Sequence, residues 1–240
     1  MHRTVTHAFN VAHPDRFFIG GQWVAPSTAD QLDLVDPVTE EVFMSVAAAA
    51  NEDMDRAVAA AREAFDVGPW PRMAPKERAN HLRRLAEALR ARSNDLAVAQ
   101  TRSMASVFTQ NLEYNGHAIA FLDMYADIGE AHEWERSETT MFPDSSALLV
   151  SEPVGVVAAI APWNGPLYLM MPKLAPALMA GCTVVVKPAP STPLEALIVA
   201  ECAEQVGFPP GVINVLCAGN DVSNHLVLNP GVDQVAFTGS

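Results

Sequence analysis

The run Val154-Gly155-Val156-Val157-Ala158-Ala159-Ile160-Ala161 decides the fold class of this chain. It is continuously apolar and of strand length, which is typical of a strand buried on both faces. Pro166 to Met179 then predicts a helix that Gly181 closes, and Thr183 to Lys187 predicts a second strand. A strand, a helix and a strand joined by short connections indicate a parallel α/β sheet.

The same alternation continues along the rest of the chain. We expect a helix over Pro193 to Val206 closed by Gly207, a strand over Ile213 to Cys217, a short helix over Asp221 to Leu228 and a strand over Gln234 to Phe237. The predicted fold is therefore α/β, with a doubly wound, mostly parallel sheet. Ligands of such sheets bind beyond the carboxyl ends of the strands.

The first half of the chain predicts short strands followed by a helical layer. The expected elements are a hairpin over Phe17 to Val24 with Gly20-Gly21 in its turn, a strand pair within Leu32 to Val46, helices that begin with Asn51 as N-cap, with Pro75 and with Ser93, and a helix over Gln110 to Glu135. Thr139 to Glu152 is polar and interrupted by proline, so we expect an extended arm. This divides the chain into residues 1–137, 138–152 and 153–240.

Composition excludes several classes of protein. Half of the 240 residues are apolar, 18% are charged and the net charge is −13, which indicates a globular chain and argues against nucleic acid or an anionic membrane as partner. Met1 to Asp15 has no long apolar run, so we expect no secretory signal. The odd set Cys182, Cys202 and Cys217 predicts reduced thiols and a cytoplasmic protein.

Four groups of residues follow the predicted strands and should meet at one edge of the sheet. They are Pro162-Trp163-Asn164, Lys187-Pro188, Ala218-Gly219 and Thr238-Gly239-Ser240. The lysine supplies a cation, the glycines and Ser240 supply backbone N–H groups of the kind that hold pyrophosphate, and Asn164 supplies an amide donor for an oxyanion. Taken singly, each is more often a turn residue, a packing residue or a solvated charge. A G-x-G-x-x-G fingerprint is absent from the sequence.

Several longer motifs resemble the aldehyde dehydrogenase superfamily, and the resemblance covers almost the whole chain after about residue 15. The C-terminal motifs are Glu152-Pro153-Val154-Gly155-Val156, Ala161-Pro162-Trp163-Asn164-Gly165-Pro166-Leu167, Lys173-Leu174-Ala175-Pro176-Ala177-Leu178, Gly181-Cys182-Thr183-Val184-Val185-Val186-Lys187-Pro188, Gly207-Phe208-Pro209-Pro210-Gly211-Val212-Ile213-Asn214-Val215 and Phe237-Thr238-Gly239-Ser240. The N-terminal ones are Phe18-Ile19-Gly20-Gly21-Gln22-Trp23, Asp36-Pro37-Val38-Thr39 and Gly68-Pro69-Trp70-Pro71-Arg72-Met73.

The resemblance implies oxidation of an aldehyde to a carboxylic acid with NAD or NADP as cofactor. It implies that Asn164 stabilises the oxyanion, that Lys187 holds the adenosine ribose, that Gly219 and Asn220 lie at the adenine, and that Ser240 contacts pyrophosphate. The implied cofactor-binding set is Ile160, Ala161, Pro162, Trp163, Lys187, Ala189, Pro190, Gly219, Asn220, Phe237, Thr238, Gly239 and Ser240. The arm resembles the family's oligomerisation hairpin, which implies a homo-oligomer in the full-length form.

Two departures from the family pattern limit these expectations. Pro190 stands where many NAD-preferring members carry a glutamate for the ribose hydroxyls, so the choice between NAD and NADP stays open. The family's nucleophilic cysteine and general-base glutamate follow the Phe-Thr-Gly-Ser motif, beyond Ser240. The three cysteines of this chain read as buried, inert thiols, and the histidines show no metal-ligand spacing.

Two hypotheses follow for the function of this chain. It is the cofactor-binding part of an aldehyde dehydrogenase cut short before its nucleophile, or a natural short form that binds nucleotide or pairs with a full-length subunit without catalysis. The coding sequence after Ser240 separates them. We expect no aldehyde oxidation and at best weak nucleotide binding by the isolated chain, together with poor solubility.

Overall fold

The computed structural model describes residues 9–142 and 144–239, and it has the α/β architecture that the sequence predicts. The main sheet has the order β10-β7-β8-β9-β1-β2. Its four parallel strands are β7 (Val156–Ile160), β8 (Thr183–Lys187), β9 (Ile213–Val215) and β10 (Gln234–Phe237). All residues of β7, β8 and β9 are buried, as a sheet covered on both faces requires.

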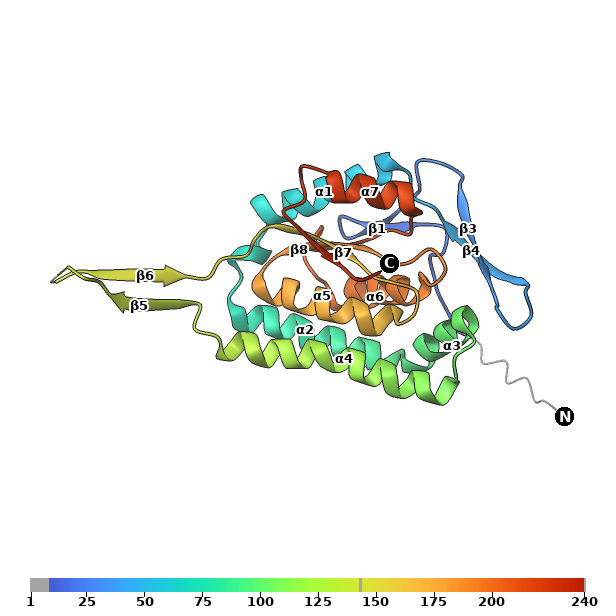
Figure 1. The fold of residues 1–240 in the computed structure, drawn as a ribbon, viewed down its shortest axis with the longest axis horizontal. Helices are drawn as coiled ribbons and strands as arrows, with labels where there is room; N and C mark the ends of the chain where they lie inside the picture. The colour runs from blue at the N-terminus through green and yellow to red at the C-terminus, as the bar shows by residue number, and fades with distance from the viewer. Residues whose placement is uncertain (1–8, 143, 240) are drawn as a thin grey trace.

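Helices cover both faces of this sheet (Figure 1). On one face lie α5 (Pro166–Ala180) and α6 (Leu194–Val206), with α2 (Pro75–Ala91), α3 (Ser93–Met104) and α4 (Phe108–Ala131) packed outside them. On the other face lie α1 (Asn51–Asp66) and α7 (Asn220–Leu228), which contact each other. Two apolar cores result, one on each face of the sheet.

Left-handed glycines end the two crossover helices where the sequence predicts. Gly181 after α5 and Gly207 after α6 have φ values of +97° and +78°, a region that L side chains rarely adopt. Each glycine turns the chain back toward the sheet, into β8 and into the segment that leads to β9. The crossovers therefore stay short, and the strands that flank them lie side by side.

The predicted N-terminal hairpin extends the same sheet. β1 (Phe17–Ile19) pairs antiparallel with β2 (Gln22–Val24) and also with β9, so the sheet is mixed at this edge. The second strand pair, β3 (Gln31–Val35) and β4 (Val42–Ala47), forms a separate two-stranded sheet. Both pairs appear where the sequence predicts them.

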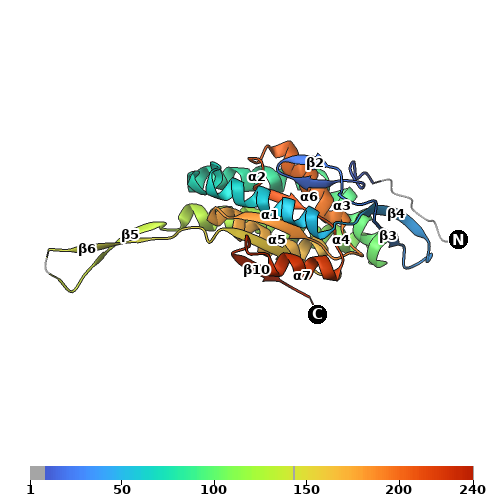
Figure 2. The ribbon, with the colours of Figure 1, turned by 90° about the horizontal axis from the view of Figure 1, so that it is seen from above.

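An exposed hairpin leaves the body of the molecule between α4 and β7 (Figure 2). It consists of β5 (Glu135–Thr139) and β6 (Ser146–Val150), and every residue of both strands is exposed. The predicted boundary at 137/138 falls inside β5, so the arm begins earlier in the chain than expected. The division into three parts otherwise stays a prediction.

Several predicted boundaries differ from the structure by one to a few residues. Asn51 is the first helical residue of α1 and Ala50 is the N-cap, whose N–H donates to the Asp53 carboxylate at 3.0 Å. The helix that was expected to reach Glu135 ends at Ala131. The strand expected to reach Cys217 ends at Val215.

The amino end of β7 is fixed by the turn at Gly155. Gly155 has φ +130°, and a Cβ there would lie 1.8 Å from an oxygen of Asp233. That carboxylate accepts a hydrogen bond from the Val156 N–H at 2.7 Å and an ion pair from Arg62 at 2.7 Å. The turn thus sets the level at which β7 and β10 start side by side.

In the part of the chain that the structure describes, no helix is long and apolar enough to span a bilayer.

Candidate active site at the carboxyl ends of the strands

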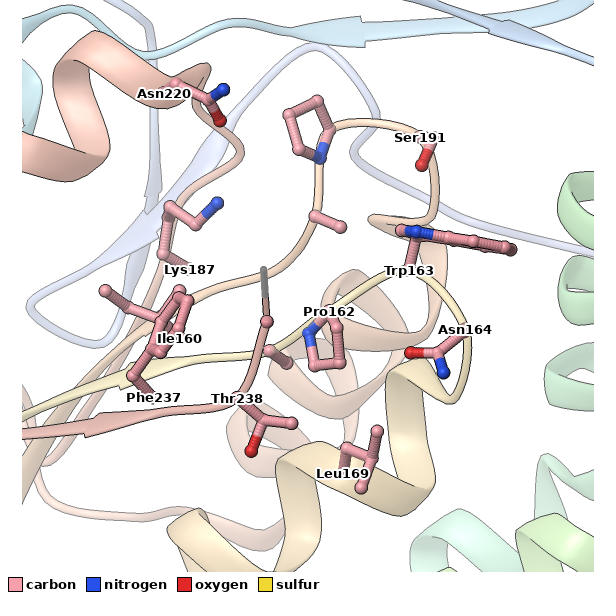
Figure 3. A pocket seen from close by; sticks show the side chains of 14 residues that line it. Ile160, Pro162, Trp163, Asn164, Leu169, Lys187, Ser191, Asn220, Phe237 and Thr238 are labelled. Carbon is pink, nitrogen blue, oxygen red and sulfur yellow. The ribbon is translucent and has the colours of Figure 1, made fainter.

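A cavity of about 510 Å³ opens beyond the carboxyl ends of β7, β8 and β10 (Figure 3). Its volume falls in the range of about 300–1,000 Å³ that is usual for ligand pockets. The lining residues are Ile160, Ala161, Pro162, Trp163, Asn164, Leu169, Lys187, Ala189, Pro190, Ser191, Asn220, Phe237, Thr238 and Gly239.

The sheet topology explains why a cavity forms here. β7 leads through α5 to β8 on one side, while β10, its neighbour on the other side, is reached through α7 on the opposite face of the sheet. β7 and β10 therefore lie at the point where the strand order reverses, which is where sheets of this kind form a ligand-binding crevice. This is the edge at which the sequence predicts the functional groups.

Among the described residues that line the cavity, Lys187 supplies the only charged side chain. The residue is 4% exposed, and its Nζ has no hydrogen-bond partner among the described residues. Burial lowers the pKa of this ammonium, because a charged group loses hydration in the sheet interior. A buried amine without a protein partner at the edge of a cavity is suited to donate hydrogen bonds to a ligand.

Trp163 and Asn164 line the other side of the cavity in Figure 3. Both follow β7, and both are exposed, Trp163 by 59%. Asn164 directly precedes Gly165, the N-cap of α5, whose carbonyl accepts the first helical bond from Leu169 N–H at 2.8 Å. The amide of Asn164 thus lies beside a helix N-terminus, where both can stabilise negative charge.

The third wall is the turn after β10. Thr238 N–H donates to the Ile160 carbonyl at 3.2 Å and so continues the ladder past the last strand residue. Phe237 is 59% exposed at the edge of the sheet, and Gly239 follows. Ser240, which completes the predicted pyrophosphate contact, lies outside the described residues.

The three cysteines are buried, as the sequence predicts. Burial raises the pKa of the Cys202 and Cys217 thiols to about 12 and also raises that of Cys182. Thiols are nucleophilic only as thiolates, so none of these side chains is activated. No group of three or more His, Cys, Asp or Glu side chains that could hold a metal ion occurs within residues 9–142 and 144–239.

The structure brings together most of the residues that the resemblance singled out. Twelve of them line the cavity, namely Ile160 to Asn164, Lys187, Ala189, Pro190, Asn220, Phe237, Thr238 and Gly239. Gly219 is the N-cap of α7 and does not line it. Sequence reasoning missed Ser191 and Leu169, which reach the cavity from a loop and from the first turns of α5. Neither residue directly follows a predicted strand, so the rule that ligands bind at strand ends did not identify them.

Comparison with known proteins decides the family. The model of the aldehyde dehydrogenase family matches residues 23–240 of the chain. The chain belongs to the aldehyde dehydrogenase family. Within this aldehyde dehydrogenase chain, the match includes every residue that lines the cavity.

Curated and solved relatives agree with this assignment. The geranial dehydrogenase of Castellaniella defragrans is 45% identical over 226 residues, which cover 93% of this chain and 47% of that protein. The NADP/NAD-dependent aldehyde dehydrogenase PuuC of Escherichia coli is 36% identical, with 97% of this chain and 47% of that protein covered. Betaine aldehyde dehydrogenase from Staphylococcus aureus, solved in complex with NAD⁺, is similar with a TM-score of 0.90, 31% identity and coverage of 93% of this chain and 44% of that one. This aldehyde dehydrogenase chain therefore spans less than half the length of these relatives.

Proposed function

We propose that this chain binds NAD⁺ or NADP⁺ in the cavity beyond β7, β8 and β10, as the cofactor-binding part of an enzyme that oxidises an aldehyde to a carboxylic acid. The observation that carries the proposal is Lys187. Its buried ammonium has no hydrogen-bond partner among the described residues and lies at the edge of a cavity whose other lining side chains are uncharged. The relatives support it, since the S. aureus enzyme was solved with NAD⁺ and the E. coli enzyme is named for both cofactors.

Each wall of the cavity has a chemical role in this proposal. When bound, the nicotinamide of the cofactor accepts a hydride. Lys187 donates to the ribose hydroxyls of the adenosine, and the backbone of Thr238 and Gly239 leaves room for the phosphates. Asn164, at the start of α5, donates to the oxygen of the aldehyde as negative charge develops there.

The nucleophile of the reaction is not among the cysteines of this chain. All three thiols are buried and have raised pKa values. The proposal therefore assigns to this chain the cofactor and the oxyanion amide, and assigns the thiol to another part of a complete enzyme. A cytoplasmic location is part of the same proposal.

Titration of the chain with AMP and with NAD⁺ tests the cofactor proposal. Saturation-transfer NMR suits this purpose because it detects millimolar affinities. We expect both ligands to bind, and we expect Lys187→Met to weaken both by about tenfold, the effect of losing about 1.4 kcal/mol of charge-assisted hydrogen bonding. Lys76→Met removes an exposed lysine of α2 and is the matched control. Failure of the wild-type chain to bind either ligand refutes the proposal.

A second proposal concerns the exposed arm, which favours association with another copy of the chain. Leu148, Leu149 and Val150 of β6 are 48–61% exposed, and Met141 and Phe142 at the turn are 89% and 68% exposed. A two-stranded hairpin with apolar side chains gains stability when a further strand pairs with its edge. The non-catalytic alternative, in which the chain only pairs with a full-length subunit, uses this same arm.

A further inference from the structure

Lys173 of α5 connects the helix to the turn after β10. Its Nζ donates to the Leu169 carbonyl, one turn earlier in the same helix, and to the Thr238 Oγ1, both at 2.6 Å. Thr238 lines the cavity, whereas Lys173 does not. Lys173 therefore contacts the site through one hydroxyl.

The turn after β10 has few other attachments. In the described sheet β10 is an edge strand whose neighbour is β7, and Gln234, Val235 and Phe237 are exposed. By contrast, β7 and β8 are fully buried in the middle of the sheet. Packing thus fixes the ends of β7 and β8 much more firmly than the end of β10, which forms the third wall of the cavity.

Two hydrogen bonds hold Thr238 in place. Its N–H donates to the Ile160 carbonyl of β7 at 3.2 Å, and its hydroxyl accepts from the Lys173 ammonium of α5. The first bond fixes the height of the turn relative to the sheet. The second fixes the turn against α5, the helix that begins two residues after Asn164.

We infer that Lys173 is a positioning residue, which holds Thr238 and with it the turn of residues 237–239 where the phosphates of a dinucleotide are received. The inference rests on the proposed function of the cavity. Lys173 also places a positive charge directly behind Thr238.

The alternative is that Lys173 only stabilises the packing of α5. Partial burial of a lysine costs free energy because the ammonium loses hydration, and burial accordingly lowers the pKa of Lys173. Charge-assisted hydrogen bonds to two oxygens offset this cost, but a methionine of similar length would fill the same space without it. The position therefore favours a role for the charged hydrogen bond from Lys173 to Thr238.

Hydrogen exchange of the ligand-free chain tests the tether. We expect Lys173→Met to raise exchange about tenfold in residues 234–239 and to leave residues 155–161 unchanged, since β7 has its own neighbours. Lys173→Arg keeps the charge and the donors and should retain most of the protection. Thr238→Val removes the acceptor instead and should raise exchange in the same residues, which keeps the test available if Lys173→Met folds poorly. Unchanged exchange of residues 234–239 in Lys173→Met and in Thr238→Val overturns the inference.

Binding of AMP and NAD⁺ to the same variants tests what the tether does. Lys173→Met should weaken NAD⁺ by about tenfold and AMP less, because AMP carries only one of the two phosphates that the turn receives. The double variant Lys173→Met/Thr238→Val should be no weaker than Thr238→Val alone, since one bond is removed in both. Equal NAD⁺ binding by wild type and Lys173→Met overturns the inference and leaves the proposed function intact. If the wild type binds neither AMP nor NAD⁺, the proposed function is refuted, and the proposed role of Lys173 in phosphate binding is refuted with it.

Discussion

Ile160 and Lys187 lie opposite each other in the register of β7 and β8, and each is the last residue of its strand. On the other side of β7, Ile160 lies opposite Phe237, the last residue of β10. Three neighbouring parallel strands therefore end at one level. The ladder continues by one hydrogen bond on each side of β7, from Thr238 N–H to the Ile160 carbonyl and from Ala161 N–H to the Lys187 carbonyl. The residues that follow line the cavity.

We propose that Pro190, which lines the cavity, allows it to accept either cofactor. The lining residues include no carboxylate that would repel a 2′-phosphate, so we expect NAD⁺ and NADP⁺ to bind with affinities within about tenfold of each other. Pro190→Glu should weaken NADP⁺ by about tenfold relative to NAD⁺, because like charges at short range cost about 1 kcal/mol or more. Pro190→Gln, which is neutral, is the control. Equal effects of both substitutions on the two cofactors would contradict this assignment.

The buried thiols predict a chemically inert chain. At pH 8 we expect Cys182, Cys202 and Cys217 to react with a disulfide reagent at least about 100-fold more slowly in the folded chain than in urea, because exposure and thiolate formation are both suppressed. The purified chain should form no NAD(P)H from an aldehyde. Rapid labelling of one thiol, or cofactor reduction that this labelling abolishes, would mean that a nucleophile is present.

Glu195 predicts how stability depends on pH. This carboxyl in the first turn of α6 is fully buried, neither oxygen has a hydrogen-bond partner among the described residues, and burial raises its pKa from 4.5 to about 8. Between these two values the unfolded chain is ionised at this residue while the folded chain holds the proton. Folding therefore takes up a proton, and the free energy of unfolding falls as the pH rises from about 4.5 to about 8.

Urea unfolding of Glu195→Gln at pH 5 and pH 8 measures this contribution. The neutral amide cannot ionise, so the loss of stability between the two pH values should be smaller than in the wild type. Glu87→Gln on the exposed face of α2 is the control and should leave the pH dependence unchanged. An identical pH dependence in Glu195→Gln would show that the carboxyl is not buried as a neutral acid.

The arm predicts self-association that depends on its apolar side chains. Leu148 and Val150 are two residues apart in β6 and share one face of the hairpin. We expect Leu148→Lys/Val150→Lys to shift the chain toward monomer in sedimentation velocity at several concentrations, since paired lysines repel and lose apolar contact. Glu87→Lys controls for the change in charge. A wild-type chain that stays monomeric at every concentration would contradict self-association through the arm.

The order of strands and helices could be predicted from the sequence because each element carries its own local signal. The run around Val157 is too apolar for an exposed strand, and Gly181 and Gly207 mark helix ends that have left-handed backbone. Exact ends were less predictable. Neither glycine nor proline follows Ala131 at the end of α4, and Gly129 lies inside the helix, so the local sequence does not mark where the helix ends and the arm begins.

The cavity was predictable to the extent that it depends on strand ends. Lys187 and Asn164 follow buried runs, and parallel topology then places them at one edge. Lys173 was not predictable as part of the site, because its role depends on a contact with Thr238, 65 residues away in the chain. The same holds for the junction of β1 with β9, which pairs Phe18 with Val215.

Mapping of backbone amide shifts on titration with NAD⁺ tests the central claim most directly. We predict shift changes that cluster in residues 160–164, 187–191, 219–220 and 237–239. These changes should reach a plateau in the wild type and should not reach one in Lys187→Met at the same NAD⁺ concentrations. Shifts that appear elsewhere, for example along β5 and β6, or that are the same in wild type and Lys187→Met, would contradict a cofactor site at the carboxyl ends of the strands.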